Sequence, residues 1–176
     1  YKPGQYLGIK VQPKHCEYAE MRQYSLSDKP NSTTYRISVK REQGEVNGLV
    51  SNHLHESVEQ GDVLDILPPA GDFFLQHQHL PTVLISAGVG LTPMMSMLEA
   101  TVDSHPQTPI HFLHACENPD QHSFTQRVAE LEKMTPELNA YTWYANHAPE
   151  QENQLLDLGV KDAQIHYEVF GPHSDL

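Results

Sequence analysis

The hydrophobic pattern changes once along this chain, near residues 76–81, and this change constrains the fold more than any other feature. Before it, short segments rich in Val, Ile, Leu and Tyr alternate with polar turns, which is typical of antiparallel strands. The expected strands cover 5–12, 21–27, 34–41 and 62–67, with one helix over 49–57. Strands at this spacing predict a small antiparallel barrel over residues 1–77.

After residue 81, apolar strand segments alternate with helical segments. The expected strands cover 82–87, 110–115, 140–145 and 165–170, and the expected helices cover 93–102 and 123–134, with a third ending near 154–158. This alternation predicts parallel strands joined by right-handed crossovers, hence a doubly wound parallel sheet. The sequence therefore predicts a β-barrel followed by an α/β domain over 78–176.

The segment from Leu84 to Pro93 runs from a buried strand into two glycines and then a helix. Gly88 and Gly90 permit positive φ angles and close approach of the backbone to an anion. Thr92 is expected to cap the helix, and Pro93 suits its first position. Free amides at such a helix start would bind a dinucleotide pyrophosphate. No Lys follows, which excludes a P-loop NTPase, and a tight turn without a ligand remains the alternative.

A second candidate site is the strand segment Arg22-Gln23-Tyr24-Ser25. We expect Arg22, Tyr24 and Ser25 to lie on one face of this strand. The Arg could neutralise a phosphate, the Tyr ring could lie against an isoalloxazine, and the Ser hydroxyl could bind a ring nitrogen. On these residues alone, an amphipathic edge strand with exposed polar side chains is the better interpretation.

Six short motifs in a fixed order change that interpretation. They are Pro3–Tyr6, Arg22–Ser25, Val39–Arg41, Gly48–Ser51, Pro69–Phe73 and Gly88–Pro93. Over nearly its whole length the chain resembles the ferredoxin–NADP reductase superfamily. The segments Ala70–Phe74 and Tyr167–His173 resemble the C-terminal reductase region of bacterial flavohaemoglobins, a family of nitric oxide dioxygenases.

The resemblance implies two cofactor sites, for FAD and for NAD(P)H. The FAD contacts would be Tyr6, Arg22, Gln23, Tyr24, Ser25, Val50 and Ser51, with Arg22 at the pyrophosphate. The NAD(P)H phosphates would lie at Gly88, Val89, Gly90, Leu91, Thr92 and Pro93, and Asn118, Asp120 and Arg127 could contact the adenosine. Glu168 would lie near the isoalloxazine, with Val169, Phe170, Gly171 and Pro172 closing over it. Glu168, Tyr24 and Ser25 are the expected catalytic residues.

The resemblance also implies the reaction. A hydride would pass from NAD(P)H to FAD, and electrons would then pass to a haem in an N-terminal globin domain outside this chain, for conversion of nitric oxide to nitrate. The acidic segment 116–120 favours NADH over NADPH. Two alternatives remain: a free-standing flavin or ferredoxin-type reductase, and a nucleotide-binding module without turnover.

The chain departs from the family pattern at two places. It starts at Tyr1, where the family has already completed one barrel strand, so we expect a longer polypeptide and an open barrel. Near 147–153 an expected strand ending in Cys-Gly-Pro, with most of its helix, is missing. We predict that residues are omitted from the sequence between about His147 and Asn153, and a true deletion is the alternative. A true deletion would leave the nicotinamide subsite incomplete.

Composition narrows the possible partners and location. The net charge of -12 argues against nucleic acid and against an anionic membrane surface, and no apolar segment is long enough for a membrane span. Cys16 and Cys116 share no motif, so a reducing, cytoplasmic location is expected. The twelve histidines include pairs at 53 and 55 and at 77 and 79, but neither pair has a third ligand at a suitable spacing, so no metal site is expected.

Overall fold

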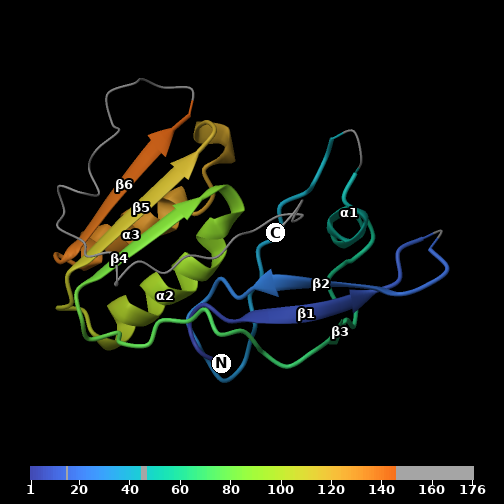
Figure 1. Ribbon diagram of the computed structural model, residues 1–176, viewed down its shortest axis with the longest axis horizontal. Helices are drawn as coiled ribbons and strands as arrows, with labels where there is room; N and C mark the ends of the chain where they lie inside the picture. Colours follow the sequence, from blue (N-terminus) through green and yellow to red (C-terminus); the bar gives the residue numbers. More distant parts are fainter. Residues whose placement is uncertain (15, 45–46, 146–176) are drawn as a thin grey trace.

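The computed structural model describes residues 1–14, 16–44 and 47–145. The described chain contains two sheets with a long helix between them (Figure 1). The elements of the first half are β1 (Tyr6–Val11), β2 (Glu20–Ser25), α1 (Leu49–Glu56) and β3 (Asp65–Ile66). Those of the second half are β4 (Thr82–Ala87), η1 (Gly88–Gly90), α2 (Leu91–Ser104), β5 (Ile110–Cys116), η2 (Pro119–Gln121), α3 (Thr125–Met134) and β6 (Leu138–Tyr144).

The first sheet is antiparallel, in the order β2-β1-β3. Single bridges from Tyr6 to Ala70 and from Leu26 to Ile37 extend it. Alternate residues of β1 are buried on one face, where they form a small core with Leu26 and with Val50 of α1. The antiparallel half of the prediction is therefore confirmed, as an open sheet with bridges at its margins.

The predicted strand over 34–41 is wrong, because only Ile37 makes a bridge there. The backbone of this segment is instead held by separate contacts: Ser27 N–H donates to the Arg36 carbonyl at 2.8 Å, and Nε2 of His55 lies 2.8 Å from the Val39 carbonyl oxygen. The Arg36 side chain leaves the sheet and reaches Glu99 on α2. A local pattern of apolar residues could not indicate this long-range contact.

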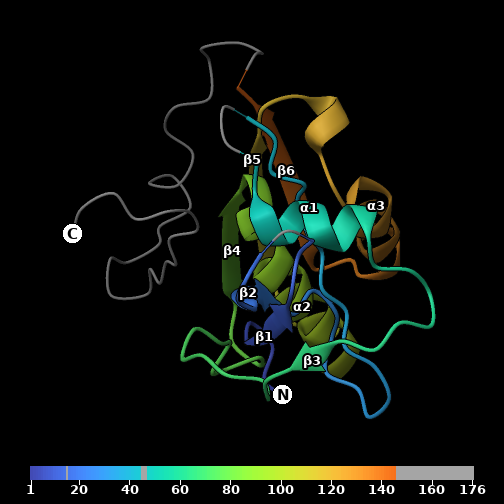
Figure 2. The ribbon, with the colours of Figure 1, turned by 90° about the vertical axis from the view of Figure 1, so that its right-hand side faces the viewer.

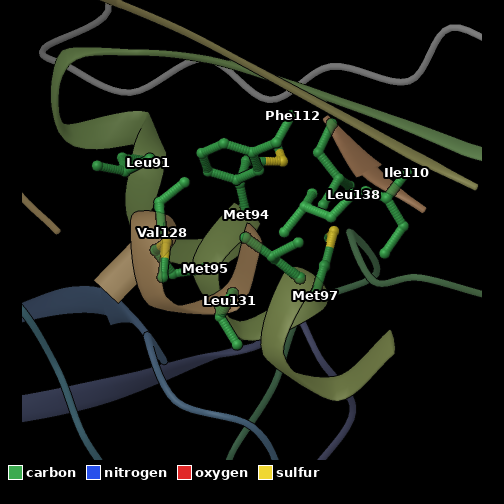
Figure 3. Packing of buried hydrophobic residues seen from close by; sticks show 11 residues of the cluster. Leu91, Met94, Met95, Met97, Ile110, Phe112, Val128, Leu131 and Leu138 are labelled. Atoms are coloured by element: carbon green, nitrogen blue, oxygen red, sulfur yellow. The ribbon is translucent and has the colours of Figure 1, made fainter. Parts of the chain in front are cut away.

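The second sheet is parallel, in the order β4-β5-β6, as predicted. Each crossover carries a helix, and because both crossovers progress in one direction, α2 and α3 cover the same face. Figure 2 shows α2 and α3 on the same face of the parallel sheet. Their apolar side chains meet Leu84, Ile110, Phe112 and Leu138 of the sheet in the main core (Figure 3).

Helix α2 also closes the junction between the two halves. The Ser96 hydroxyl on α2 donates to the Asp28 carbonyl at 2.5 Å. Gly4 has φ +106, and a Cβ there would lie 2.4 Å from Cε of Met97 and 2.6 Å from the Phe73 carbonyl oxygen. Only glycine fits between the first half and this helix, so the two halves pack closely.

Several predictions fall outside the described residues: the helix near 154–158, the strand over 165–170 and the segment missing near 147–153. The division between residues 77 and 78 also remains a prediction. No helix in the described ranges is long and apolar enough to cross a lipid bilayer.

Candidate functional site

Arg22 and Tyr24 lie on one face of β2, because alternate strand residues point the same way. In the antiparallel register Ile9 pairs with Arg22 and Leu7 with Tyr24, so this face continues onto the buried side of β1. The Arg22 side chain is 55% exposed, and its guanidinium contacts Glu20 and the Met21 carbonyl. Partial burial raises the pKa of Tyr24, and the positive charge of Arg22 opposes that rise. An exposed cation therefore lies beside a half-buried phenol.

Ser25 does not share this face, which corrects the expectation that all three side chains lie together. It is adjacent to Tyr24, so a strand directs it to the opposite face, where its register partner is Tyr6. A Cβ at Gly71 would lie 2.8 Å from the Tyr6 ring, so the ring packs directly on that glycine. The predicted residues thus divide between two faces of β2 and β1.

Helix α1 begins beside the Arg22 face, since Val50 of its first turn packs in the same core as Leu7 and Ile9. The Ser51 hydroxyl donates to the Gly48 carbonyl at 3.3 Å and accepts from Glu42 N–H at 3.3 Å. The first turn carries no acidic side chain. Its free amides are therefore available to an anion beside Arg22.

The glycine loop at the end of β4 differs from its prediction in two respects. Helix α2 begins at Leu91 with Gly90 as its cap, so Thr92 and Pro93 lie within the first turn. The Thr92 hydroxyl donates to the Val89 carbonyl at 3.1 Å and makes no capping bond. Gly88 has φ +50, which favours glycine. Gly90 has φ -60, an angle that any residue can adopt. The 3-10 turn takes up the residues between the strand and the helix.

Gly88 is nevertheless the open point of this loop. Apart from its chain neighbours, a Cβ placed there would meet no atom of the described residues within 4 Å. Val89 is partly exposed, while Thr92 and Pro93 are buried in the helix start. The loop therefore presents bare backbone to an open space at the carboxyl edge of a parallel sheet, where ligands of such sheets bind.

A polar cluster that the sequence did not reveal spans the same edge. Ser86 Oγ lies 2.9 Å from Nδ1 of His114, the His114 and His122 rings are 5.3 Å apart, and Nδ1 of His122 lies 3.0 Å from the Tyr144 hydroxyl. Burial lowers the pKa of His114 to about 4, aided by His122 and opposed by the Ser86 hydrogen bond. Burial also lowers the pKa of His122. In the sequence, this cluster is indicated only by Ser86 and His114, which lie at equivalent positions near the ends of two predicted strands.

Comparison with known proteins decides the family. The sequence profile of the oxidoreductase NAD-binding domain matches residues 84–174. A Vibrio cholerae flavohemoprotein is 40% identical over 210 residues, covering 100% of this chain and 53% of that protein. The crystal structure of the flavohem-like FAD/NAD binding domain of nitric oxide dioxygenase from Vibrio cholerae O1 biovar El Tor is 38% identical, with a TM-score of 0.85 over 98% of this chain and 86% of that one. The chain belongs to the flavohemoprotein reductase family.

Two more distant structures support the fold alone. Amycolatopsis cytochrome P450 reductase is 24% identical with a TM-score of 0.70, covering 81% of this chain and 42% of that one. Plasmodium falciparum ferredoxin-NADP+ reductase is 18% identical with a TM-score of 0.73, covering 87% and 63%. Together with the Vibrio cholerae structure, they confirm the predicted fold class.

The flavohemoprotein reductase family comprises FAD- and NAD(P)H-dependent oxidoreductases, which confirms the predicted enzyme class and cofactors at family level. This chain spans about half of the length of its curated relative. The alignment covers 210 positions and this chain has 176 residues, so the relative has residues without a counterpart here.

The described residues fit the family's cofactors. An exposed guanidinium, a half-buried phenol and an acid-free helix start on one face suit a flavin that carries a pyrophosphate. The open backbone at Gly88 suits a dinucleotide pyrophosphate. Glu168, Val169, Phe170, Gly171 and Pro172 lie outside the described residues, and their roles stay predictions.

The residues expected near the adenosine are already engaged within the protein. Asn118 caps η2, with its side chain accepting from Gln121 N–H at 3.1 Å. Arg127 donates to Glu99 at 2.8 Å and to Glu130 at 3.4 Å, and the Glu99 bond is the main cause of its raised pKa. Arg127 is therefore a poor candidate for a ribose 2′-phosphate. Asp120 lies in the first turn of η2, and its contact with the adenosine stays a prediction.

Proposed function

We propose that this chain binds FAD on its antiparallel half and NADH on its parallel half, and that it passes hydride from the nucleotide to the flavin. The observation that carries the proposal is the shared face of Arg22, Tyr24 and the start of α1. A cation and free amides beside an aromatic ring match the pyrophosphate and ring system of one ligand. The open glycine loop supports the dinucleotide site.

The described residues of the FAD site have different roles in this proposal. Arg22 and the amides at Val50 and Ser51 hold the FAD pyrophosphate, while Tyr24 lies against the flavin. Ser25 and Tyr6 would contact the FAD at the end of β2, from the face of the sheet opposite to Tyr24. When bound, FAD supplies the capacity to accept a hydride and release electrons one at a time. Glu168 and residues 169–172 are proposed to lie at the ring.

The acceptor is proposed to be the haem of a globin domain in a longer protein, which would use the electrons to convert nitric oxide to nitrate. This rests on the similarity to the Vibrio cholerae flavohemoprotein, of which the chain matches about half. A cytoplasmic location and the absence of nucleic acid or membrane partners belong to the same proposal, supported by the net charge of -12.

NADH is the proposed donor for an electrostatic reason. The first segment after β5 contains Glu117 and Asp120, which would repel a 2′-phosphate. Arg127, the first cation along α3, is paired with two carboxylates. NADPH therefore lacks a described partner for its additional charge.

The experiment is an anaerobic titration of the FAD-loaded chain with NADH and, separately, with NADPH. We expect NADH to bleach the flavin absorbance faster than NADPH at equal concentration. Binding of FAD without bleaching by either nucleotide would contradict the reductase and favour a nucleotide-binding module. Addition of a ferric flavohemoprotein globin domain or of an oxidised ferredoxin then tests the acceptor. Preferential reduction of the ferredoxin would favour a free-standing reductase.

A further inference from the structure

Glu99 on α2 is a buried carboxylate held between two arginines from different parts of the chain. Its side chain is 3% exposed. Oε2 accepts from Arg36 Nη2 at 3.3 Å, and Oε1 accepts from Arg127 Nε at 2.8 Å. Each carboxylate oxygen therefore has its own guanidinium. A carboxylate at this depth depends on such partners, because burial removes its hydration.

Arg36 belongs to the first half of the chain and is fixed there. Its Nη2 also donates to the Ser27 carbonyl, its Nε donates to Ser27 Oγ at 3.3 Å, and its own carbonyl accepts from Ser27 N–H at 2.8 Å. Arg36 is thus anchored to Ser27, which lies two residues after Ser25 at the end of β2. From there its guanidinium crosses to the second half.

The Arg36 guanidinium reaches the carboxyl edge of the parallel sheet, where α3 begins. The Arg36 guanidinium carbon lies 5.5 Å from the ring centroid of Phe124. Phe124 has φ 61, an unfavourable conformation for a bulky residue, and it directly precedes α3. Phe124 and Arg127 both line a hollow with His122, Thr125, Gln126 and Glu130. Arg36 therefore connects the end of β2 to the wall of this hollow.

We propose that Arg36, Glu99 and Arg127 form a clamp that sets the position of the parallel half against the antiparallel half for hydride transfer. The inference rests on the proposed function, because it concerns transfer between sites on different halves. Reacting atoms must approach to about 3–3.5 Å, and a 1 Å misplacement can cost about a hundredfold in rate. The three are positioning residues, since none is placed against the flavin or the nicotinamide.

A second ion pair across the junction provides a matched control. Lys29 contacts Asp103 of α2, but these side chains are 39% and 59% exposed. Exposed pairs fix geometry weakly because water and salt screen them. Asp103→Asn should therefore leave the arrangement of the halves unchanged, whereas Glu99→Gln should loosen it.

The first measurement uses the FAD-loaded chain and stopped-flow reduction by NADH. For Glu99→Gln and Arg36→Met we expect a fall of about tenfold or more in the flavin-reduction rate at saturating NADH. FAD affinity should be unchanged, Arg36→Lys should recover part of the rate, and Asp103→Asn should match the unmodified chain. A fall in NADH affinity with an unchanged saturating rate would overturn the clamp and assign Arg127 to nucleotide binding.

The second measurement does not depend on activity. Spin labels at the exposed positions Glu59→Cys and Gln107→Cys, in a Cys16→Ser background, report the distance between the two halves by pulsed electron resonance. We expect a broader distance distribution in Glu99→Gln and Arg36→Met than in Asp103→Asn. Identical distributions would overturn the proposal. If Glu99→Gln fails to fold, the Arg36 variants decide, because that side chain is 39% exposed.

The two hypotheses fail differently. Failure of NADH to bleach the unmodified FAD-loaded chain contradicts the proposed function, while the spin-label distances still test the clamp. Normal bleaching with unaltered rates and distances in the variants contradicts the clamp alone.

Discussion

Ser86 Oγ lies 2.9 Å from Nδ1 of His114, its register partner on the neighbouring parallel strand. The His114 side chain is 1% exposed, so the imidazole has lost nearly all of its hydration. One hydrogen bond to a neutral hydroxyl does not compensate a buried positive charge, and the neutral ring is favoured. The edge of the sheet that we propose binds the nucleotide therefore contains a buried histidine that is neutral in the folded protein.

We predict that this histidine makes the protein unstable to mild acid. Burial lowers the folded-state pKa from 6.5 to about 4, so between these values the unfolded chain binds a proton that the folded chain does not. The contribution is fully present above pH 6.5 and is lost as the pH falls toward 4. Its size is on the order of 3 kcal/mol. Urea unfolding at pH 7 and pH 5 should show a loss of roughly 2 kcal/mol, the part of the contribution that falls between these two pH values.

The control for this prediction removes the titrating group. His114→Gln should be less stable at pH 7 but should show a flatter dependence of unfolding free energy on pH. His77→Gln, at an exposed histidine, should keep the dependence of the unmodified chain. An equally steep profile in His114→Gln would assign the acid sensitivity to another group.

Gly71→Ala should weaken flavin binding through Tyr6. The glycine has φ +106, and a Cβ there would lie 2.8 Å and 2.9 Å from two atoms of the Tyr6 ring. We expect a loss of about 1–3 kcal/mol in unfolding free energy from backbone strain, and a further loss of FAD affinity from displacement of the ring. Gly61 has φ +102, and a Cβ there would meet no atom within 4 Å among the residues that the structure describes, its chain neighbours aside, so Gly61→Ala isolates the backbone cost. Equal FAD affinity in both variants would contradict a role for Tyr6.

Arg22→Met should reduce FAD affinity without destabilising the fold. The Arg22 side chain is 55% exposed and its ion pair with Glu20 lies at the surface, so the unfolding free energy should change by less than about 0.5 kcal/mol. Loss of a charge-assisted bond to the pyrophosphate should cost about 1.5–3 kcal/mol in FAD binding. Riboflavin has no pyrophosphate, so its affinity should not change. Isothermal titration with both flavins, with Lys10→Met as the control, tests this.

Gly88→Ala should affect the nucleotide more than the fold. The position has φ +50 and open space around its Cβ, so the expected loss of stability is only about 1–2 kcal/mol of backbone strain. A methyl group in that space would separate the backbone from a bound pyrophosphate. NADH affinity, followed by fluorescence titration, should therefore fall while FAD affinity stays constant. An unchanged NADH affinity would remove the loop from the proposed site.

Sequence periodicity predicted the elements that depend on neighbouring residues. The strand over 82–87 is found at its predicted limits, and the helix predicted over 49–57 is observed as α1 over Leu49–Glu56. The change of pattern near 76–81 separated antiparallel from parallel pairing, since the connection between strands limits how they can pair. The resemblance to the reductase family was confirmed because ordered short motifs are themselves a property of the sequence.

Tertiary structure decided which side chains meet. Ser25 lies on the opposite face from Tyr24, and α2 begins before Thr92 because a 3-10 turn intervenes. Arg36 leaves its expected strand for Glu99, 63 residues further along the chain. Periodicity reports only which local face is apolar, whereas a buried charge is stabilised by partners that the fold brings from distant segments.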